Sequence, residues 1–423
     1  MTEEFLHYIW KYKRFNPTQL ETQYGESIQV LKPGDHNSDS GPDFFNAKLK
    51  IGKTLWAGNV EIHIRSSDWN RHNHQSDPAY DNVILHVVHE NDVKIVRKNG
   101  EEIQTLELRG RFDDNSFKKY LQFKGSKSWI PCATQVKSVE SFRLNAWLDR
   151  LLVERLERKA IAISTELEKN KNNWEETFYQ QLARSFGFKV NSEPLELLAK
   201  SMPVSIVARH KNSLFQLEAL LYGQAGMLEK QFADTYPQYL QNEYIFLQKK
   251  YTLKSIDSHL WKFLRLRPSN FPTIRISQFA ALIHNSAHLF SQILEVKSPE
   301  DIRKLLNVGA SEYWLTHYSF DKKSPRKSKV LGIEGVNSTI INTIVPFLFI
   351  YGKSNAEEKY VEASLNLLEK IEAEQNSIIA NWKRAGIRAT TAYQSQALLQ
   401  LKNEYCSAKR CLECSLGAKL LQG

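Results

Sequence analysis

The chain has 423 residues, of which 42% are hydrophobic and 11% aromatic, so it can form substantial cores and is not a disordered chain. Its length exceeds that of one ordinary core and predicts two or three domains. The 57 Lys and Arg against 47 Asp and Glu give a net charge of +10, which favours anionic partners, nucleic acid first.

The sequence indicates neither secretion nor a membrane span. Two acidic residues and no long apolar stretch stand at the N-terminus, unlike in a signal peptide. The most apolar run begins at Thr339 and continues for about 14 residues, which is too short to span a bilayer. Only four cysteines occur, which argues against a secreted disulfide scaffold. We therefore expect a cytoplasmic protein with no membrane contact.

The first 135 residues are dominated by strand-like runs. An amphipathic helix is predicted at 3–15, and a second at 66–77 with Ser66 or Ser67 as its N-cap. The Asn99-Gly100 pair is a strong hairpin signal between two alternating runs. The predicted strands cover residues 27–31, 43–51, 54–65, 82–88, 93–97 and 103–108.

After about residue 138 apolar residues recur at helical spacing. The fold class predicted is α+β, with a mixed α/β sheet domain over 1–135 and a large all-α domain over 136–423. Residues 1–135 contain 18 basic and 18 acidic residues, so the net charge of +10 comes entirely from residues 136–423. We therefore expect the helical domain to bind any polyanion. The predicted helices cover 139–168, 173–186, 212–228, 238–252, 277–294, 337–351, 355–383 and 391–408.

Acidic and imidazole side chains are concentrated in the hairpin predicted at 43–65. Because strand side chains alternate, Glu61, His63 and Arg65 share one face, and the turn near Gly52 returns Asp43 alongside them. Two converging carboxylates would form an oxygen-rich site for Mg²⁺ or Mn²⁺. Such an ion could activate water and neutralise charge on a phosphodiester. The alternative is a structural strand pair whose polar face is simply wet.

Nearby residues extend this hypothesis. His72, His74 and Asp77 could add ligands, although a His-x-His pair in a polar loop is more typical of solvated side chains. His86 alternates into the same face as Ile84 and Val88 and is predicted to be a packed core histidine.

The hairpin resembles the PD-(D/E)XK nuclease superfamily, whose pattern is an Asp, often after Pro, then an acid-x-Lys one strand later. Pro42-Asp43 would supply the first element, Glu61 the acid, and His63 would occupy the Lys position. The resemblance covers roughly residues 1–110 and implies an αβββαβ core with metal ligands Asp43 and Glu61. His63 would orient or deprotonate water, or Arg65 would supply the missing cation.

The implied function is metal-dependent hydrolysis of phosphodiester bonds in nucleic acid, with Asp43, Glu61 and His63 as catalytic residues. The alternative is a non-enzymatic nucleic-acid-binding or scaffold protein that keeps the nuclease-like sheet without turnover. The sequence leaves enzymatic activity and any protein partner open.

Five longer sequence motifs occur along the chain: GPDFFNA, GNVEIHIRSSDW, YDNVILHVV, RPSNFPTIRISQFA and YCSAKRCLECSLG. With these motifs nearly the whole chain resembles an uncharacterised bacterial family of unknown function, common in Bacteroidetes. That resemblance implies no established activity.

The four cysteines form a second candidate site. Cys406, Cys411 and Cys414 have metal-ligand spacing, and Cys132 would complete four thiolates. Such a set suits a tetrahedral Zn²⁺ or an iron–sulfur cluster, and the sequence favours neither. The alternative is a set of buried or free thiols on a terminal helix.

Arginines suited to phosphate and base contacts stand beside an aromatic residue in RLRPSNFPTIR. The residues are Arg265, Arg267 and Arg275, and with Arg65 they are the candidate nucleic-acid contacts. Arginine–acid pairing between helices is the alternative explanation. A second basic segment, 319–329, has five Lys or Arg and is typical of a solvated loop.

Overall fold

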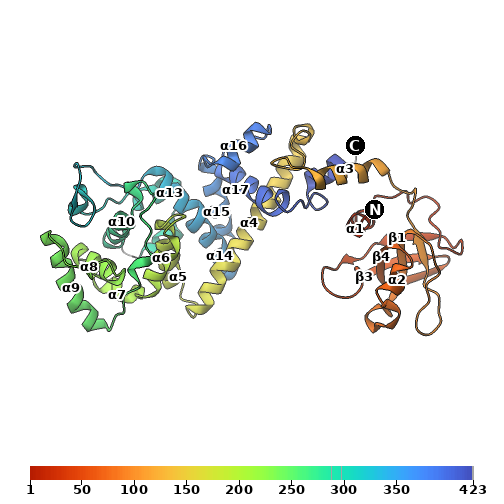
Figure 1. Ribbon diagram of the computed structural model, residues 1–423, viewed down its shortest axis with the longest axis horizontal. Helices are drawn as coiled ribbons and strands as arrows, with labels where there is room; N and C mark the ends of the chain where they lie inside the picture. Colours follow the sequence, from red (N-terminus) through yellow and green to blue (C-terminus); the bar gives the residue numbers. More distant parts are fainter. Residues whose placement is uncertain (287, 297, 422–423) are drawn as a thin grey trace. The chain divides into compact units, whose positions relative to one another are not determined.

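A computed structural model describes residues 1–286, 288–296 and 298–421 (Figure 1). The chain divides into two compact units. Unit 1 combines Met1–Trp147 with the C-terminal Leu401–Gly423, and unit 2 is Leu148–Gln400. The expected division was after residue 135, with a second domain continuing to the end of the chain. In the structure the C-terminal segment, and with it the cysteine cluster, belongs to the unit that contains the sheet.

Within the described residues, unit 1 holds a six-stranded mixed sheet in the order β1-β3-β4-β5-β6, with the short β2 also on β3. The first three strands of that order pair antiparallel, whereas β5 lies parallel to both β4 and β6. The strands are β1 (Ile28–Lys32), β2 (Asp35–His36), β3 (Phe44–Ile51), β4 (Thr54–Arg65), β5 (Val83–Glu90) and β6 (Thr105–Glu107).

Helices and short turns complete unit 1. Helix α1 precedes the sheet, and α2 lies in the crossover that a parallel β4–β5 pair requires. The predicted α+β class is confirmed. The elements are α1 (Glu3–Lys11), α2 (Asp68–Arg71), the 3₁₀ turns His74–Ser76 and Pro78–Tyr80, α3 (Asp114–Gly125), the 3₁₀ turn Val136–Ser138 and α18 (Ser415–Leu421).

The β3–β4 hairpin has the register that the sequence predicts. Gly52 takes the positive φ of +57° that the turn needs, and Ile51 pairs with Thr54. At the other end Phe44 pairs with Val60, after a bulge at which Asn46 has φ +55°. This pairing brings Asp43, the residue before β3, next to Glu61 on β4.

Two local predictions differ from the structure. The run at 93–97 forms only an isolated bridge, between Val96 and Glu102. The helix expected at 66–77 shrinks to α2 and a 3₁₀ turn, and Ser67 makes no side-chain cap bond. The Ser67 hydroxyl instead donates to the Asp92 carboxylate at 2.8 Å, because the loop after β5 reaches back to this segment.

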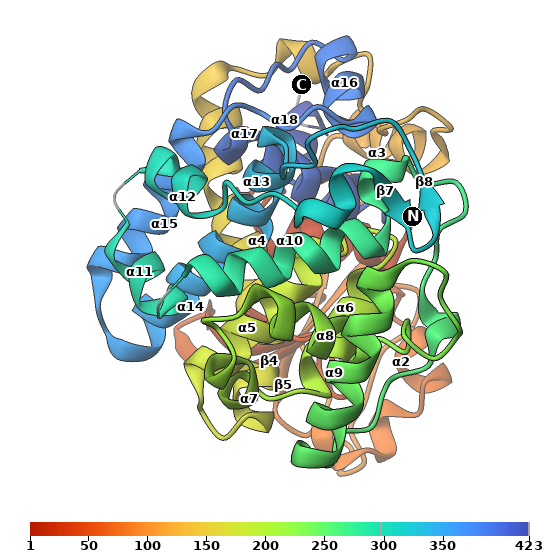
Figure 2. The ribbon, with the colours of Figure 1, turned by 90° about the vertical axis from the view of Figure 1, so that its left-hand side faces the viewer.

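Unit 2 is helical apart from the two-stranded β7 (His317–Ser319) and β8 (Lys322–Lys323) (Figure 2). Helix α4 (Ser141–Lys169) begins in unit 1 and continues into unit 2. The other helices are α5 (Trp174–Phe186), α6 (Ser192–Lys200), α7 (Val204–Arg209), α8 (Leu214–Gln224), α9 (Thr235–Tyr251), α10 (Pro272–Asn285), α11 (Leu289–Glu295), α12 (Pro299–Leu305), α13 (Ile333–Thr339), α14 (Val345–Asn355), α15 (Glu358–Lys370), α16 (Ser377–Arg384) and α17 (Ala392–Gln400).

Several predicted helices are interrupted. The helix predicted at 277–294 corresponds to α10 and α11, and position 287 between them lies outside the described residues. The one predicted at 355–383 is split into α15 and α16 by the segment 371–376. The one at 391–408 continues from α17 into a π-helical turn over Leu401–Cys406.

Helices α13 and α14 are joined by a second π-helical turn, Ile340–Ile344, into one helical stretch over Ile333–Asn355. By length and composition this stretch could cross a membrane, and among the described residues it is the single such candidate. However, 61% of its apolar window is buried inside the structure, and α14 packs along α15. That packing is typical of a core helix.

Candidate metal centre

Strand β4 carries Glu61 and His63 into the interior of unit 1. The first half of this strand is exposed, but residues 60–63 are buried on both faces. Glu61 retains 4% of its exposure and His63 2%. Two polar side chains buried this deeply require partners, because burying an unpaired polar group lowers the folding stability by about 2–7 kcal/mol.

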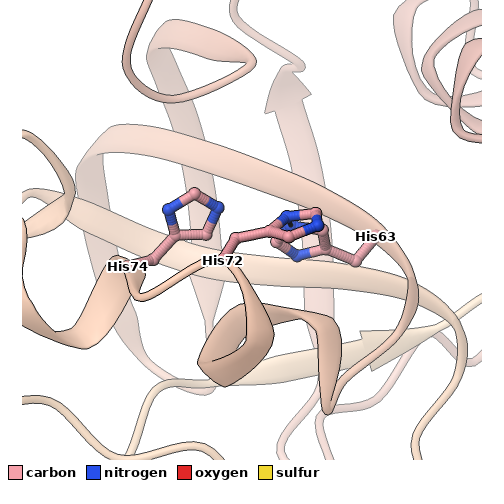
Figure 3. A group of neighbouring side chains, drawn as sticks. All are labelled: His63, His72 and His74. Atoms are coloured by element: carbon pink, nitrogen blue, oxygen red, sulfur yellow. Dashed lines mark hydrogen bonds between the residues drawn. The ribbon is translucent and has the colours of Figure 1, made fainter.

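Two further histidines reach the same place from the turn after α2. His72 follows the helix directly, Asn73 takes a left-handed φ of +62°, and His74 begins the next 3₁₀ turn. Figure 3 shows the imidazoles of His63, His72 and His74 gathered together. One ring nitrogen of each lies within 4.8 Å of the other two.

The distances within this group are short. His63 Nε2 lies 3.1 Å from His72 Nδ1. The Oε1 atom of Glu61 lies 3.6 Å from His63 Nε2 and 3.4 Å from His74 Nε2. Three imidazoles therefore converge, and a carboxylate oxygen of Glu61 lies beside two of them. We call Glu61, His63, His72 and His74 the histidine site.

His86 on β5 supports the histidine site from behind. It is fully buried, as the sequence predicts, and its Nε2 lies 2.9 Å from Nδ1 of His63. If His63 Nδ1 donates in this bond, the Nε2 lone pair of His63 faces His72. Such fixing of the tautomer by an outer partner is typical of metal-binding histidines.

Asp43 borders the histidine site and is held by three contacts. Its amide N–H donates to Oε2 of Glu61 at 3.0 Å, and its own Oδ2 accepts from the amide of Ile62 at 2.9 Å. The same Oδ2 lies 3.2 Å from Nε2 of His7 on α1. The two acids are adjacent as the sequence predicts, but the Asp43 carboxylate is already bonded to backbone and imidazole.

Burial disfavours the charged forms of the two deeply buried members of the histidine site, His63 and Glu61. Burial and the repulsion of His86 and the other imidazoles lower the pKa of His63 to about 2, so this ring is neutral. Burial raises the pKa of Glu61, and the charge of Asp43 adds to the effect. Burial opposes protonation of His7, but the bond to Asp43 outweighs it and raises the pKa of that imidazole.

Sequence reasoning missed part of this arrangement. His72 is exposed, as its polar loop suggests, and His74 is half-buried, yet their ring nitrogens gather with that of His63. His7 carries no local signal because it lies on an ordinary amphipathic helix. Asp77 caps the next 3₁₀ turn by accepting from the amide of Ala79 at 2.9 Å. The readable clue was the His-x-His spacing just after a strand with two polar residues facing inward.

The candidate nucleic-acid residues are divided between the two units and differ in exposure. Arg65 is exposed and lies 3.7 Å from Glu90. Arg275 is buried in unit 2, where it bonds Gln278 and stacks on the Phe188 ring at 4.4 Å. Its guanidinium therefore holds the fold together, whereas Arg265 and Arg267 are exposed.

The four cysteines all lie in unit 1 and are free thiols. Cys132, Cys411 and Cys414 are buried, and Cys406 is partly buried. In the sequence these four residues lie outside the segment 61–74 that carries the histidine site. We call them the cysteine site.

Comparison with known proteins identifies a family but no activity. No curated protein and no solved structure matches the chain. A family model described as "Protein of unknown function (DUF2851)" matches residues 3–377. The resemblance of nearly the whole chain to an uncharacterised family is thereby confirmed, and the nuclease resemblance stays a prediction. Since the match extends over most of the sequence, the chain belongs to the DUF2851 family of proteins of unknown function.

Proposed function

We propose that this protein hydrolyses phosphodiester bonds in nucleic acid with a divalent metal ion held at the histidine site. The observation that supports this most directly is the convergence of three imidazole nitrogens within 4.8 Å, with a carboxylate oxygen 3.4–3.6 Å from two of them. Apart from the two-residue strand β2, the order of α1, β1, β3, β4, α2 and β5 in unit 1 also fits the αβββαβ core of the superfamily that the sequence resembles.

The spacing of the donor atoms suits tetrahedral coordination. Ligands at 2.0–2.1 Å from a tetrahedral ion lie about 3.3 Å from one another. Here His63 Nε2 lies 3.1 Å from His72 Nδ1, and the three imidazole nitrogens all lie within 4.8 Å of one another. A contraction of this group would let the three imidazoles bind one ion.

The donor types favour zinc over the magnesium suggested by the motif. Mg²⁺ prefers an octahedron of oxygens, whereas imidazole nitrogens suit Zn²⁺ and related transition metals. The site offers three imidazoles, and the Asp43 carboxylate is bonded elsewhere. Mg²⁺ does not fit this donor set, and Mn²⁺, which accepts mixed nitrogen and oxygen donors, is the second choice.

The ion and the side chains around it would have different roles in catalysis. The ion would supply Lewis-acid polarisation of the phosphoryl group and of water. With the three imidazoles as its ligands, the ion would keep a position open for water. Glu61, fixed through Oε2 by the Asp43 amide, would then accept the proton of that water at Oε1.

Replacement of Glu61 by Gln tests the proposal. We expect cleavage of single- or double-stranded DNA or RNA by the Zn²⁺- or Mn²⁺-loaded protein, and a loss of about 100-fold or more in Glu61→Gln because the general base is removed. Glu90→Gln is the matched control, since Glu90 is a half-exposed carboxylate on β5 that pairs with Arg65 and Arg109. Absence of cleavage across all substrates and metals would contradict a nuclease.

A non-enzymatic nucleic-acid-binding or scaffold protein is the second candidate. Four donors can fill every position of a tetrahedral ion, as in structural sites, whereas catalytic sites keep one position open. His63 is also neutral and cannot supply the cation of the motif lysine. On this alternative, Glu61→Gln weakens metal binding, no variant cleaves, and binding of nucleic acid falls steeply with added salt.

A further inference from the structure

Two basic segments of unit 2 that lie far apart in the sequence, 261–275 and 319–329, line one pocket of about 450 Å³. The first segment is also bonded to the residue before the second, because the Thr273 hydroxyl donates to the carbonyl oxygen of Tyr318 at 2.6 Å. Aromatic and cationic side chains share the wall of this pocket, and they are Trp261, Phe263, Phe320, Lys230 and Lys322.

The aromatic part of the wall is held firmly by its neighbours. Trp261 is buried, and its indole N–H donates to the carbonyl oxygen of Ala225 at 2.8 Å. Phe263 is only half-buried, and its ring meets that of Phe271 in a T-shaped arrangement with centroids 5.2 Å apart. A ring that is supported by a neighbour and still partly open can stack on a nucleobase.

Each basic segment uses one buried cation to hold its own backbone in place. Arg275 is buried and donates to the side-chain oxygen of Asn270 at 2.5 Å. Lys329 is buried as well, and its Nζ donates to the carbonyl oxygen of Leu315 at 3.1 Å. Both segments are therefore fixed before a ligand binds. The cations that stay exposed on them include Arg265, Arg267, Lys322, Lys323, Arg326 and Lys327.

The charge at the pocket is positive. Among the described lining residues Lys230 and Lys322 are basic, and Glu229 is the acidic one. The Glu229 carboxylate accepts a hydrogen bond from the hydroxyl of Ser255 at 3.1 Å. Asp321, next to Lys322, accepts from the backbone amides of residues 233 and 234 at 3.2 and 3.0 Å. Oxygens of both acids are thus engaged within the protein, whereas the exposed lysines can meet an external anion.

We propose that this pocket binds one nucleotide of a single-stranded nucleic acid, with the base stacked on Phe263 and the phosphates beside Lys230 and Lys322. Its volume lies within the range of small-ligand sites, about 300–1,000 Å³. A single strand can turn a base out into such a pocket, whereas the bases of a duplex stay stacked on one another. The inference rests on the proposed function for its choice of nucleic acid as the ligand, but it places binding in unit 2.

The test measures binding of a fluorescently labelled oligo(dT) to the full-length protein by anisotropy, with a chelator present so that nothing is cleaved. Phe263→Ala should weaken binding about tenfold or more without changing its salt dependence, because a stacking contact is lost. Lys322→Gln should instead lower the slope of log affinity against log salt concentration by about 0.7, because one phosphate contact is lost. Phe263→Trp, which keeps an aromatic ring, should restore the affinity.

The matched controls are Phe246→Ala and Lys383→Gln, which change an exposed phenylalanine and an exposed lysine outside the pocket lining and should bind as the wild type does. Wild-type affinity in Phe263→Ala would overturn the site. Equally tight binding of duplex DNA, of free thymidine monophosphate or of a polyglutamate peptide would overturn recognition of a single strand through its bases.

The outcome is separable from that of the proposed function. Binding that depends on Phe263, without cleavage under any metal, would contradict only the nuclease and support this pocket. Cleavage by a protein whose oligo(dT) affinity is the same in Phe263→Ala would contradict only the pocket.

Discussion

His86 is fully buried and contacts the histidine site without entering it. Its Nε2 shares a hydrogen bond with Nδ1 of His63, and its own Nδ1 has no hydrogen-bond partner among the described residues. A residue in this position acts by orienting a ligand, so its effect should appear in metal affinity before it appears in the fold.

Replacement of His86 by Leu should therefore weaken metal binding. We expect affinity for Zn²⁺ to fall about 10–100-fold, because His63 loses the partner that sets its tautomer. A chelator-competition titration measures this. His89→Leu, on the same strand but outside the histidine site, should bind as the wild type does. Equal affinities in both variants would show that His86 only fills space.

A second buried acid, Glu218 on α8, lies in unit 2. It is fully buried and accepts hydrogen bonds from the hydroxyls of Tyr236, Ser277 and Ser311. Burial raises the pKa of this carboxyl, although the hydroxyl donors oppose the shift. The folded protein thus holds its proton to a higher pH than the unfolded chain does.

This shift gives the free energy of unfolding a defined pH dependence. The contribution of Glu218 is complete below the unfolded pKa of about 4.5 and is lost as the pH rises through the higher folded pKa, by about 1.4 kcal/mol per pH unit. Glu218→Gln should flatten this decline in denaturant titrations between pH 5 and 8. Glu229→Gln, at an exposed site, should leave it unchanged. A decline that persists in Glu218→Gln would assign it to other groups.

At the scale of the element, strand β4 positions the histidine site, because it carries Glu61 and His63 and pairs with both β3 and β5. Gly58 lies where β4 meets β5, shortly before a shift in their register. A Cβ at this position would approach the Ile84 side chain to 2.5 Å and the Asn82 carbonyl oxygen to 2.7 Å. The absence of a side chain there allows the two strands to pair closely, which in turn sets His63 beside His86.

Gly58→Ala should consequently disturb both stability and metal binding. We expect a loss of about 1–3 kcal/mol of unfolding free energy from overpacking, because a backbone oxygen cannot move aside easily. The control is Gly125→Ala at the end of α3, where a Cβ would meet nothing within 4 Å and the change should be within about 0.5 kcal/mol. Comparable stability of the two variants would refute the close-pairing explanation.

At the scale of the whole molecule, the division into two units should appear in unfolding. Unit 1 is built from both ends of the chain, and unit 2 lies between them in sequence. Each has its own buried core, so each is expected to unfold cooperatively by itself.

Calorimetry should therefore resolve two thermal transitions. Gly58→Ala should lower the one that belongs to unit 1. Gly223→Ala should lower the other, because a Cβ on α8 would lie 2.0 Å from the Tyr244 ring of α9. Chelation of metal should shift only the transition that Gly58→Ala shifts. A single transition lowered by both variants would mean that the units unfold together.

Much of unit 1 could be predicted from local sequence signals. Alternation placed Glu61 and His63 on one face, the Gly52 turn set the β3–β4 register, and the position of Asp43 followed from that register. These features depend on neighbours within about 20 residues, where the pleat and the turn type leave little freedom.

The sequence by itself thus determined the α+β class, the hairpin and the adjacency of Asp43 and Glu61. Only the tertiary structure decided that His72 reaches His63 and His74 reaches Glu61, that His86 supports His63, and that the C-terminal segment from Leu401 joins unit 1. The physical reason is that these contacts cross a loop or most of the chain. Local periodicity carries no information on such contacts, since they form only when whole elements pack and bury their polar groups against one another.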